Sequence, residues 1–164
     1  MDETSLSANE IEMLILKAAR GGGLPLGHAE DLSKAAAFLD LDALTTCPCS
    51  GQTVAAIDLP LALDRVLAGL GPQTVQGERQ LAAAYCAVVA AQSGFQIETA
   101  NTDDGTRVKL TLSNSDAGQR APKGRRSIDS ALADHLAEMS SRILVPETAA
   151  SRAAGAGAGL TDND

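Results

Sequence analysis

Large aromatic side chains are nearly absent from this chain, and their absence restricts how its core can be built. Two Phe, one Tyr and no Trp make up 2% of the 164 residues, whereas apolar residues as a whole make up 45%. A core of Ala and Leu buries little area per residue, at about 25 cal/mol per Å², but it lets helices approach closely. We therefore expect thin helix contacts and a core that a second protomer can complete, and the segment patterns described below predict a helix-dominated α+β fold.

The first segment has the pattern of an amphipathic helix. Ser7 and Glu10 have the spacing of a capping box, in which each side chain satisfies a free backbone amide of the first turn. An apolar stripe with the spacing of one helix face follows them: Ile11, Leu14, Ile15, Ala18 and Ala19. Residues 21–23 are all glycine and end the helix, because glycine takes the left-handed cap cheaply.

A second helix is expected from Gly27 or His28 to about Leu39. Glu30 and Asp31 then fall in its first turn, where the helix dipole favours acids. Its apolar stripe is Leu32, Ala35, Ala36 and Leu39. A short Gly-Pro connection makes the two helices an αα-hairpin.

The centre of the chain leaves two alternatives open. Within residues 41–57, the run Val54–Ala55–Ala56–Ile57 fits either a short strand or a buried connection. Asp58, followed by Leu59 and Pro60, has the pattern of an N-cap with proline in the first turn, which predicts a helix from there to Gly71.

A further helix and a β-hairpin are predicted next. Residues 78–92 place Leu81, Tyr85, Val88 and Val89 on one helix face, and Gly94 ends it. Residues 95–112 then alternate apolar and polar residues around a turn-forming segment, Asn101 to Gly105. A lone hairpin is only marginally stable, so it must lie on helices or join other strands.

The last part of the domain is expected to be a loop and a helix. Residues 113–126 are polar and read as a mobile loop with a solvated basic cluster, Arg120, Lys123, Arg125 and Arg126. Ser127 can cap a final helix with the stripe Ile128, Leu132, His135, Leu136, Met139 and Ile143. The domain is thus assigned to residues 1–146, and residues 147–164 form a Gly/Ala-rich tail.

Charge and the chain ends exclude several partner classes. The net charge of −8 disfavours a nucleic-acid surface, which needs clustered Lys and Arg. No stretch of 18 apolar residues exists to span a membrane, and the acidic N-terminus is unlike an export signal. Together with an odd number of cysteines, these features favour a cytoplasmic protein that binds neither nucleic acid nor membrane.

The cysteines and histidines carry no recognisable catalytic motif. Cys47–Pro48–Cys49 with Cys86 falls short of the four paired ligands of a zinc site, so small buried thiols are the favoured interpretation. His135 is expected to be a partly buried packing residue, and His28 a structural residue at a helix start. We expect no metal and no cofactor.

The run Gly155–Ala156–Gly157–Ala158–Gly159 resembles a phosphate loop only in composition. A phosphate loop feeds a helix N-terminus, whereas here Asp162, Asp164 and the terminal carboxylate follow and repel anions. Binding of a divalent cation by these carboxylates is a weaker alternative. The tail is either solvated or docked into a groove of its own domain or a partner's, and the sequence leaves both open.

Two segments of the chain carry residue patterns that are typical of a family. The N-terminal segment is Asn9–Glu10–Ile11, Lys17–Ala18–Ala19–Arg20–Gly21, Gly27, Ala29–Glu30 and Lys34–Ala35–Ala36. The C-terminal segment is Pro146–Glu147–Thr148, Ser151–Arg152 and Gly155–Ala156–Gly157–Ala158–Gly159–Leu160–Thr161–Asp162–Asn163–Asp164. Together they resemble a family of uncharacterised, mainly proteobacterial proteins classed as a domain of unknown function. The resemblance implies that the tail is a family feature, and it implies no activity.

These observations favour a non-catalytic module that self-associates or docks on a protein partner. The alternative is an enzyme or small-ligand-binding protein whose pocket the tail closes, with His28, Arg152 and Asp162 converging on one cavity. Under that alternative the candidate ligand-binding residues are His28, Ser151, Arg152, Gly155, Gly157, Gly159, Asp162 and Asp164.

Overall fold

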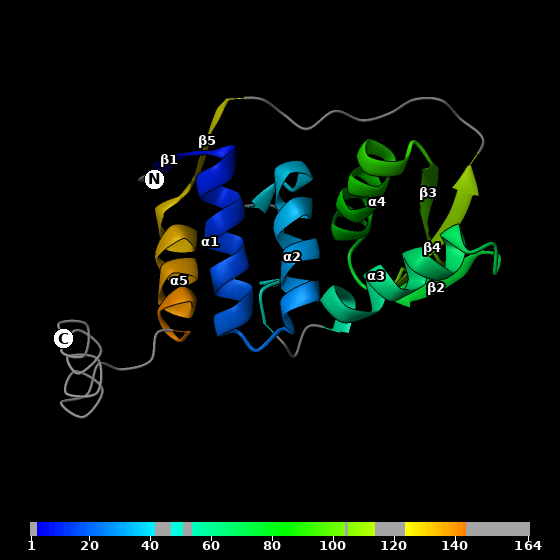
Figure 1. Ribbon diagram of the computed structural model, residues 1–164, viewed down its shortest axis with the longest axis horizontal. Coiled ribbons are helices and arrows are strands. Elements are labelled where there is room, and N and C mark those ends of the chain that lie inside the picture. The colour runs from blue at the N-terminus through cyan, green and yellow to red at the C-terminus, as the bar shows by residue number, and fades with distance from the viewer. Residues whose placement is uncertain (1–2, 42–46, 51–53, 104, 114–123, 144–164) are drawn as a thin grey trace, which may run out of the picture.

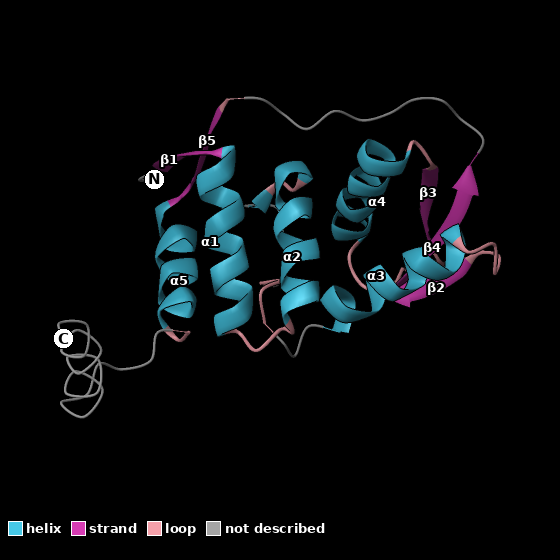
Figure 2. Ribbon diagram, viewed as in Figure 1, coloured by secondary structure: helices cyan, strands magenta, loops and turns pink. Residues whose placement is uncertain are grey.

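The computed structural model describes residues 3–41, 47–50, 54–103, 105–113 and 124–143 (Figure 1). The elements in chain order are β1 (Glu3–Ser7), α1 (Ala8–Gly21), α2 (Leu26–Ala35), the 3-10 helix η1 (Ala36–Phe38), α3 (Val54–Leu67), β2 (Gln73–Gln76), α4 (Arg79–Ser93), β3 (Gln96–Asn101), β4 (Arg107–Ser113), β5 (Arg125–Asp129) and α5 (Ser130–Ser141). Helices dominate and the strands gather at the two ends of the molecule (Figure 2), so the expected α+β class is confirmed.

One end of the molecule is built from the two ends of the described chain. Strands β1 and β5 form an antiparallel ribbon in which Glu3 is opposite Asp129 and Ser7 is opposite Arg125. Each strand leads directly into a helix, and α1 and α5 run side by side away from the ribbon (Figure 1). Helix α1 therefore lies between α5 and α2.

Helix α1 has the predicted caps at both ends. Ser7 and Glu10 form the capping box. At the other end Gly23 has a positive φ of 93°, and its N–H and that of Leu24 donate to the carbonyls of Arg20 and Ala19. This pair of bonds is a Schellman motif, in which glycine avoids the strain of a side chain at positive φ.

Helix α2 begins earlier than the sequence predicts. Its N-cap is Pro25 and its first turn starts at Leu26, so Glu30 and Asp31 lie beyond the first turn and their assignment to it was wrong. Proline is pre-organised for a helix start, and its missing N–H is not needed there. The chain then tightens into η1 and the predicted apolar stripe is fully buried.

The prediction that a helix begins at Asp58 was also wrong. Both Asp58 and Pro60 lie inside α3, which already includes Val54, so the strand alternative for residues 54–57 is wrong as well. Ala56 and Leu59 have no exposed surface. Burial of these apolar residues offsets the hydrogen bond that Pro60 cannot donate within the helix.

The other end of the molecule is a three-stranded sheet under two helices. The predicted β3–β4 hairpin is present, and β2, which the sequence did not predict, adds a strand to the other edge of β4 in the order β2–β4–β3. Helices α3 and α4 cover one face of this sheet, where Val75, Ile97, Val108 and Leu110 are buried. Helix α4 and its closing Gly94 match the prediction.

The segment expected to be a basic loop contains a strand. Arg125 and Arg126 belong to β5, so their description as loop residues was wrong, whereas Arg120 and Lys123 lie outside the described residues. Asp129, not Ser127, caps the last helix by accepting from the backbone N–H groups of Ala131 and Leu132. Ser127 and Ile128, which the sequence assigned to the start of the helix, instead belong to β5 and pair with β1.

Helix α2 joins the two ends, because it packs on α1 on one side and on α3 and α4 on the other. The buried apolar residues accordingly form one continuous cluster. In the part of the chain that the structure describes, every helix is too short or too polar to cross a bilayer.

Candidate functional site

Of the eight predicted ligand-binding residues, only His28 lies in the described part of the chain. The other seven, from Ser151 to Asp164, lie outside the described residues, so their convergence with His28 stays a prediction. His28 is half-buried in the first turn of α2, and its Nδ1 atom is buried without a hydrogen-bond partner among the described residues.

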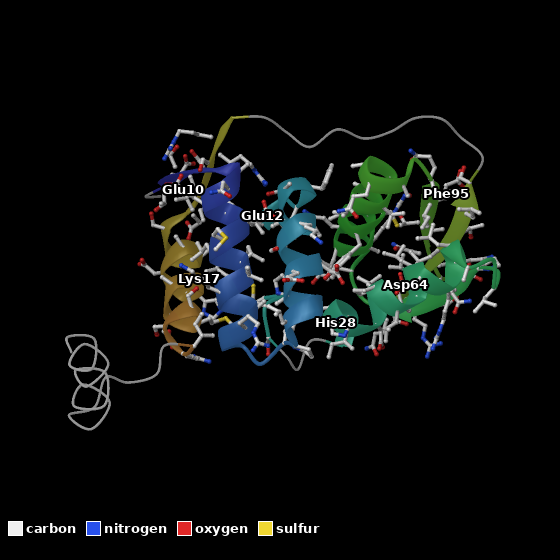
Figure 3. The ribbon with its side chains drawn as sticks, in the orientation of Figure 1. Glu10, Glu12, Lys17, His28, Asp64 and Phe95 are labelled. Atoms are coloured by element: carbon white, nitrogen blue, oxygen red, sulfur yellow. The ribbon has the colours of Figure 1, made fainter. Side chains whose placement is uncertain are left out.

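A cavity of about 210 Å³ opens one helical turn beyond His28, between α2, α3 and α4. It is lined by Asp31, Pro60, Leu63, Asp64, Leu67, Tyr85, Val88, Val89, Gln92 and Ser93. Figure 3 shows His28 at the end of α2 that lies near α3, and Asp64 on α3 itself. The lining thus combines two carboxylates with apolar walls, and it contains no Lys or Arg.

Burial raises the pKa of Asp31, the carboxylate that α2 contributes to the cavity. Lys34 and His28 lower this pKa, and the charges on Asp64 and Glu30, which have smaller effects, raise it. A carboxylate that is partly buried and faces a like charge is stabilised in its charged form when a positive charge binds nearby. The cavity is therefore an acidic site with an apolar lining.

Tyr85 adds an unpaired polar group to this cavity. The side chain is only 3% exposed, and its hydroxyl is buried without a hydrogen-bond partner among the described residues. Burial is the main cause that raises the pKa of Tyr85, and the charge on Asp31 raises it further, so the hydroxyl stays neutral. Buried tyrosine hydroxyls usually find a partner, and an unpaired one is available to a ligand.

A second hollow lies on the outer side of the α1–α5 pair, with a volume of about 530 Å³. The residues that define this α1–α5 face are Leu6, Glu10, Met13, Leu14, Lys17, Ala137, Ser140, Ser141 and Ile143. Two of its large apolar side chains are well exposed, Met13 at 42% and Ile143 at 41%. The surface is therefore apolar at its centre, with charge near both ends of α1.

Sequence reasoning identified few of these residues as functional. Asp31 was assigned to the first turn of a helix, where the helix dipole favours acids, and Asp64 was not singled out. Tyr85 was placed on the apolar face of its helix, which signals burial of the ring but not the lack of a partner for its hydroxyl. Met13 falls next to the buried stripe of α1, and only the position of α5 makes it part of a surface hollow.

Comparison with known proteins gives a family match for part of the chain. Residues 6–48 match a family described as a protein of unknown function (DUF3726). This stretch begins in β1 and includes α1, α2 and η1, and it supports the resemblance to a family of unknown function over the first part of the chain. No curated protein and no solved structure matches the chain.

Proposed function

We propose that the protein is a self-association module, in which the α1–α5 face of one copy packs against the same face of a second copy. Its role is to hold two copies together rather than to turn over a substrate. The observation that carries this proposal is the exposed apolar centre of the face, formed by Met13 and Ile143 with the half-buried Leu14. Exposed apolar patches of this kind mark interaction sites.

The charge pattern of α1 supports a second copy as the occupant. Glu10, Met13, Leu14 and Lys17 follow one another at the spacing of a single helix face. The order is acid, two apolar residues, base. A two-fold axis between Met13 and Leu14 would therefore bring Glu10 of each copy against Lys17 of the other, which is the self-complementarity that a two-fold dimer needs.

The side chains on this face are compatible with such an approach. Figure 3 shows Glu10 and Lys17 on the side of α1 toward α5, and Glu12 on the opposite side. Ala137, Ser140 and Ser141 of α5 are small, so a second helix can come close. Lys17 is exposed and has no ion-pair partner among the described residues, whereas Glu10 is within 3.6 Å of Arg125.

The test is the molar mass by light scattering after size exclusion, from low micromolar to hundreds of micromolar. The wild-type chain should shift from one copy to two with concentration. Lys17→Glu should weaken association by about tenfold, because it faces the second copy's Glu10 with a like charge. Lys109→Glu, the same change on an exposed residue of β4, should leave association unaltered.

A mixing experiment separates charge pairing from general damage. Lys17→Glu and Glu10→Lys chains should each associate poorly alone, but a mixture should form the heterodimer because both pairs become complementary. Association lost on removal of residues 144–164 but unaffected by Lys17→Glu would overturn the proposal in favour of the C-terminal segment as the occupant. A chain that stays monomeric throughout would overturn self-association itself.

A second candidate function is binding of a small organic cation in the acidic cavity. It is supported by the unpaired Tyr85 hydroxyl beside Asp31 and Asp64 with no basic residue in the lining. An alkylammonium group would pair with the carboxylates, while its chain would contact Leu63 and Val88. Specific polar groups within an apolar lining are typical of small-molecule sites.

Thermal unfolding with n-butylammonium chloride tests this second candidate. The unfolding temperature should rise with the concentration of n-butylammonium, because binding to the folded state adds about 2.7 kcal/mol to the free energy of unfolding at a hundredfold excess over Kd. Sodium chloride at equal ionic strength should not raise the unfolding temperature in this way. Asp31→Asn should abolish the effect. It should also stabilise the free protein at neutral pH, since burial of the charged Asp31 disfavours the folded state.

Asp134→Asn is the matched control, because Asp134 is exposed on α5 and distant from the cavity lining. It should retain the full effect of n-butylammonium. An equal temperature rise in the Asp31→Asn chain, or none in the wild type, would rule out this cavity as a cation site.

A further inference from the structure

The turn at Cys47–Pro48–Cys49 packs against the ends of two helices. Cys49 has no exposed surface, whereas Cys47 is half-buried. The Cys49 carbonyl comes so close to α1 that a Cβ at Gly22 would lie 2.1 Å from its oxygen. The absence of a side chain at Gly22 therefore allows the turn to sit where it does.

Helix α5 brings two more groups to the same place. The sulfur of Cys47 lies 3.8 Å from the sulfur of Met139. His135, one turn earlier on α5, lies near enough to Cys47 to help lower the pKa of its thiol. His135 is exposed, so its expected role as a partly buried packing residue was wrong. Residues 88 positions apart in the sequence thus meet at one thiol.

The two thiols of the turn differ in their chemistry. A hydrogen bond donated by the Cys49 thiol is the main cause that lowers the pKa of Cys47 to about 5, and His135 contributes to the lowering. The pKa of Cys49 is raised by the same contact and by burial. The charge therefore resides on Cys47, which solvent reaches, and the proton stays on Cys49, which solvent does not reach.

Cys86 shows what an ordinary buried thiol looks like in this protein. It lies in α4, and burial raises its pKa to about 12. The interpretation of the cysteines as small buried thiols therefore fits Cys49 and Cys86, whereas Cys47 is only half-buried. A reactive cysteine needs both thiolate character and access, and Cys47 has both.

We propose that Cys47 and Cys49 form a thiol–disulfide exchange pair, in which Cys47 is the nucleophile and Cys49 the resolving thiol, acting on small or peptide disulfides. The assignment of roles follows from access, since a substrate disulfide can reach Cys47 but not Cys49. Residues two apart have Cα atoms about 5–7 Å apart, which overlaps the separation that a disulfide requires. This inference is independent of the α1–α5 face.

The exchange proceeds in two steps. The Cys47 thiolate attacks one sulfur of the substrate disulfide, so a bond from Cys47 to the substrate forms and the substrate S–S bond breaks, releasing a thiolate that takes a proton from water. The negative charge on Cys47, which helps raise the pKa of Cys49, is then gone. Cys49 then attacks the Cys47 sulfur and its proton passes to the departing substrate sulfur, which closes the Cys47–Cys49 bond and releases the second substrate thiol.

The balance is closed without another reactant. The substrate disulfide gains two electrons and two protons, one proton from water and one from Cys49. The Cys47–Cys49 pair, which starts as one thiolate and one thiol, loses the same two electrons and the Cys49 proton. The disulfide is itself the oxidant.

Intact mass spectrometry with oxidised glutathione as the probe tests the pair. The wild-type chain should lose two hydrogens and retain no glutathione. Cys49→Ser should keep one glutathione on Cys47, since no second thiol of the turn is left to resolve the mixed disulfide. Cys47→Ser should neither lose two hydrogens nor bind glutathione on the same timescale. Cys86→Ser is the control and should match the wild type. Equal reaction of Cys47→Ser and wild type, or a Cys49→Ser chain that traps no glutathione, would overturn the proposal.

Alkylation of the wild-type chain by iodoacetamide at pH 6 is a second readout, and it does not depend on the folding of any variant. Cys47 should react about tenfold faster in the folded chain than in the chain unfolded in guanidinium, because a gain in thiolate fraction outweighs the lower nucleophilicity of each thiolate. His135→Asn should move the midpoint of the thiolate ultraviolet absorbance to higher pH. A Cys47 that reacts no faster folded than unfolded would contradict the assignment.

Discussion

Gly22 is the residue on which the position of the Cys47–Cys49 turn depends. A Cβ there would lie 2.1 Å from the Cys49 carbonyl oxygen and 2.6 Å from the Met139 methyl carbon. The first of these atoms is backbone, so it cannot move aside without displacing the turn. At residue scale, then, one missing side chain lets α1, α5 and the thiol turn meet.

Substitution of Gly22 tests this close approach. Gly22→Ala should destabilise the protein by about 1–3 kcal/mol, the usual cost of overpacking, and should slow alkylation of Cys47 or raise its pKa as the turn shifts. The measurement is urea unfolding followed by circular dichroism.

Gly27→Ala is the matched control for Gly22→Ala. Gly27 lies in α2 and a Cβ there would meet no atom within 4 Å. The substitution should leave stability unchanged or raise it by up to about 1 kcal/mol, because alanine restricts the unfolded chain. Equal losses for the two variants would show that the predicted contact at Gly22 is absent.

At the scale of elements, β5 pairs with β1 at the other end of the described chain, and one of its side chains also donates to the carbonyls at the end of η1. Arg126 donates from Nη1 to the carbonyls of Ala36 and Ala37, at 3.0 and 3.3 Å, and from Nη2 to that of Leu39. The carbonyls at the end of a helix lack the N–H groups of a following turn, and here the Ala36 carbonyl has only the N–H of Leu39 besides Arg126. A residue of the predicted basic loop thus supplies side-chain donors to the carbonyls of η1 and its C-cap, Leu39.

Arg126→Met keeps the length of the side chain and removes its donors. It should destabilise the protein by about 1.5–3 kcal/mol, since it leaves half-buried carbonyls without a charged donor. Arg125→Met should have a smaller effect, because Arg125 contacts Ser5 and Glu10 at the exposed surface. Urea unfolding of both variants at one pH decides between them, and the reverse order would contradict the capping role.

At the scale of the whole molecule, α2 joins two groups of packed elements into one hydrophobic core. On one side it meets the α1–α5 pair with its ribbon, and on the other it meets α3 and α4 above the sheet. Small side chains at these contacts, such as Ala18, Ala29 and Ala35, are fully buried and let the helix axes approach. The α1–α5 face is formed by residues of β1, α1 and the α5 region, whereas the acidic cavity is formed by residues of α2, α3 and α4.

Net charge bears on how the self-association should be measured. Each copy carries a formal charge of −8, so two copies repel each other at low ionic strength. At about 0.1 M salt the screening length is about 10 Å, which removes most of this repulsion while leaving close pairs such as Glu10 and Lys17 in contact. Association is therefore best compared between variants near physiological ionic strength.

The sequence determined the elements whose signals are local. The capping box at Ser7, the glycine stop of α1, the buried stripe of α4 and the alternation of the β3–β4 hairpin all depend on residues within a few positions of one another. Their outcome could be predicted because propensity and pattern agree there. The class of the fold followed from them.

Tertiary structure decided what depends on residues far apart in the chain. Pairing of β1 with β5 turned part of the expected basic loop into a strand, and burial of Ala56 and Leu59 extended α3 back from Asp58 to Val54. The meeting of Cys47 with His135 and the cavity around Tyr85 likewise have no local signal. The physical reason is that strand partners, burial and the field around an ionisable group are set by neighbours in space, and neighbours in space are fixed only once the helices pack.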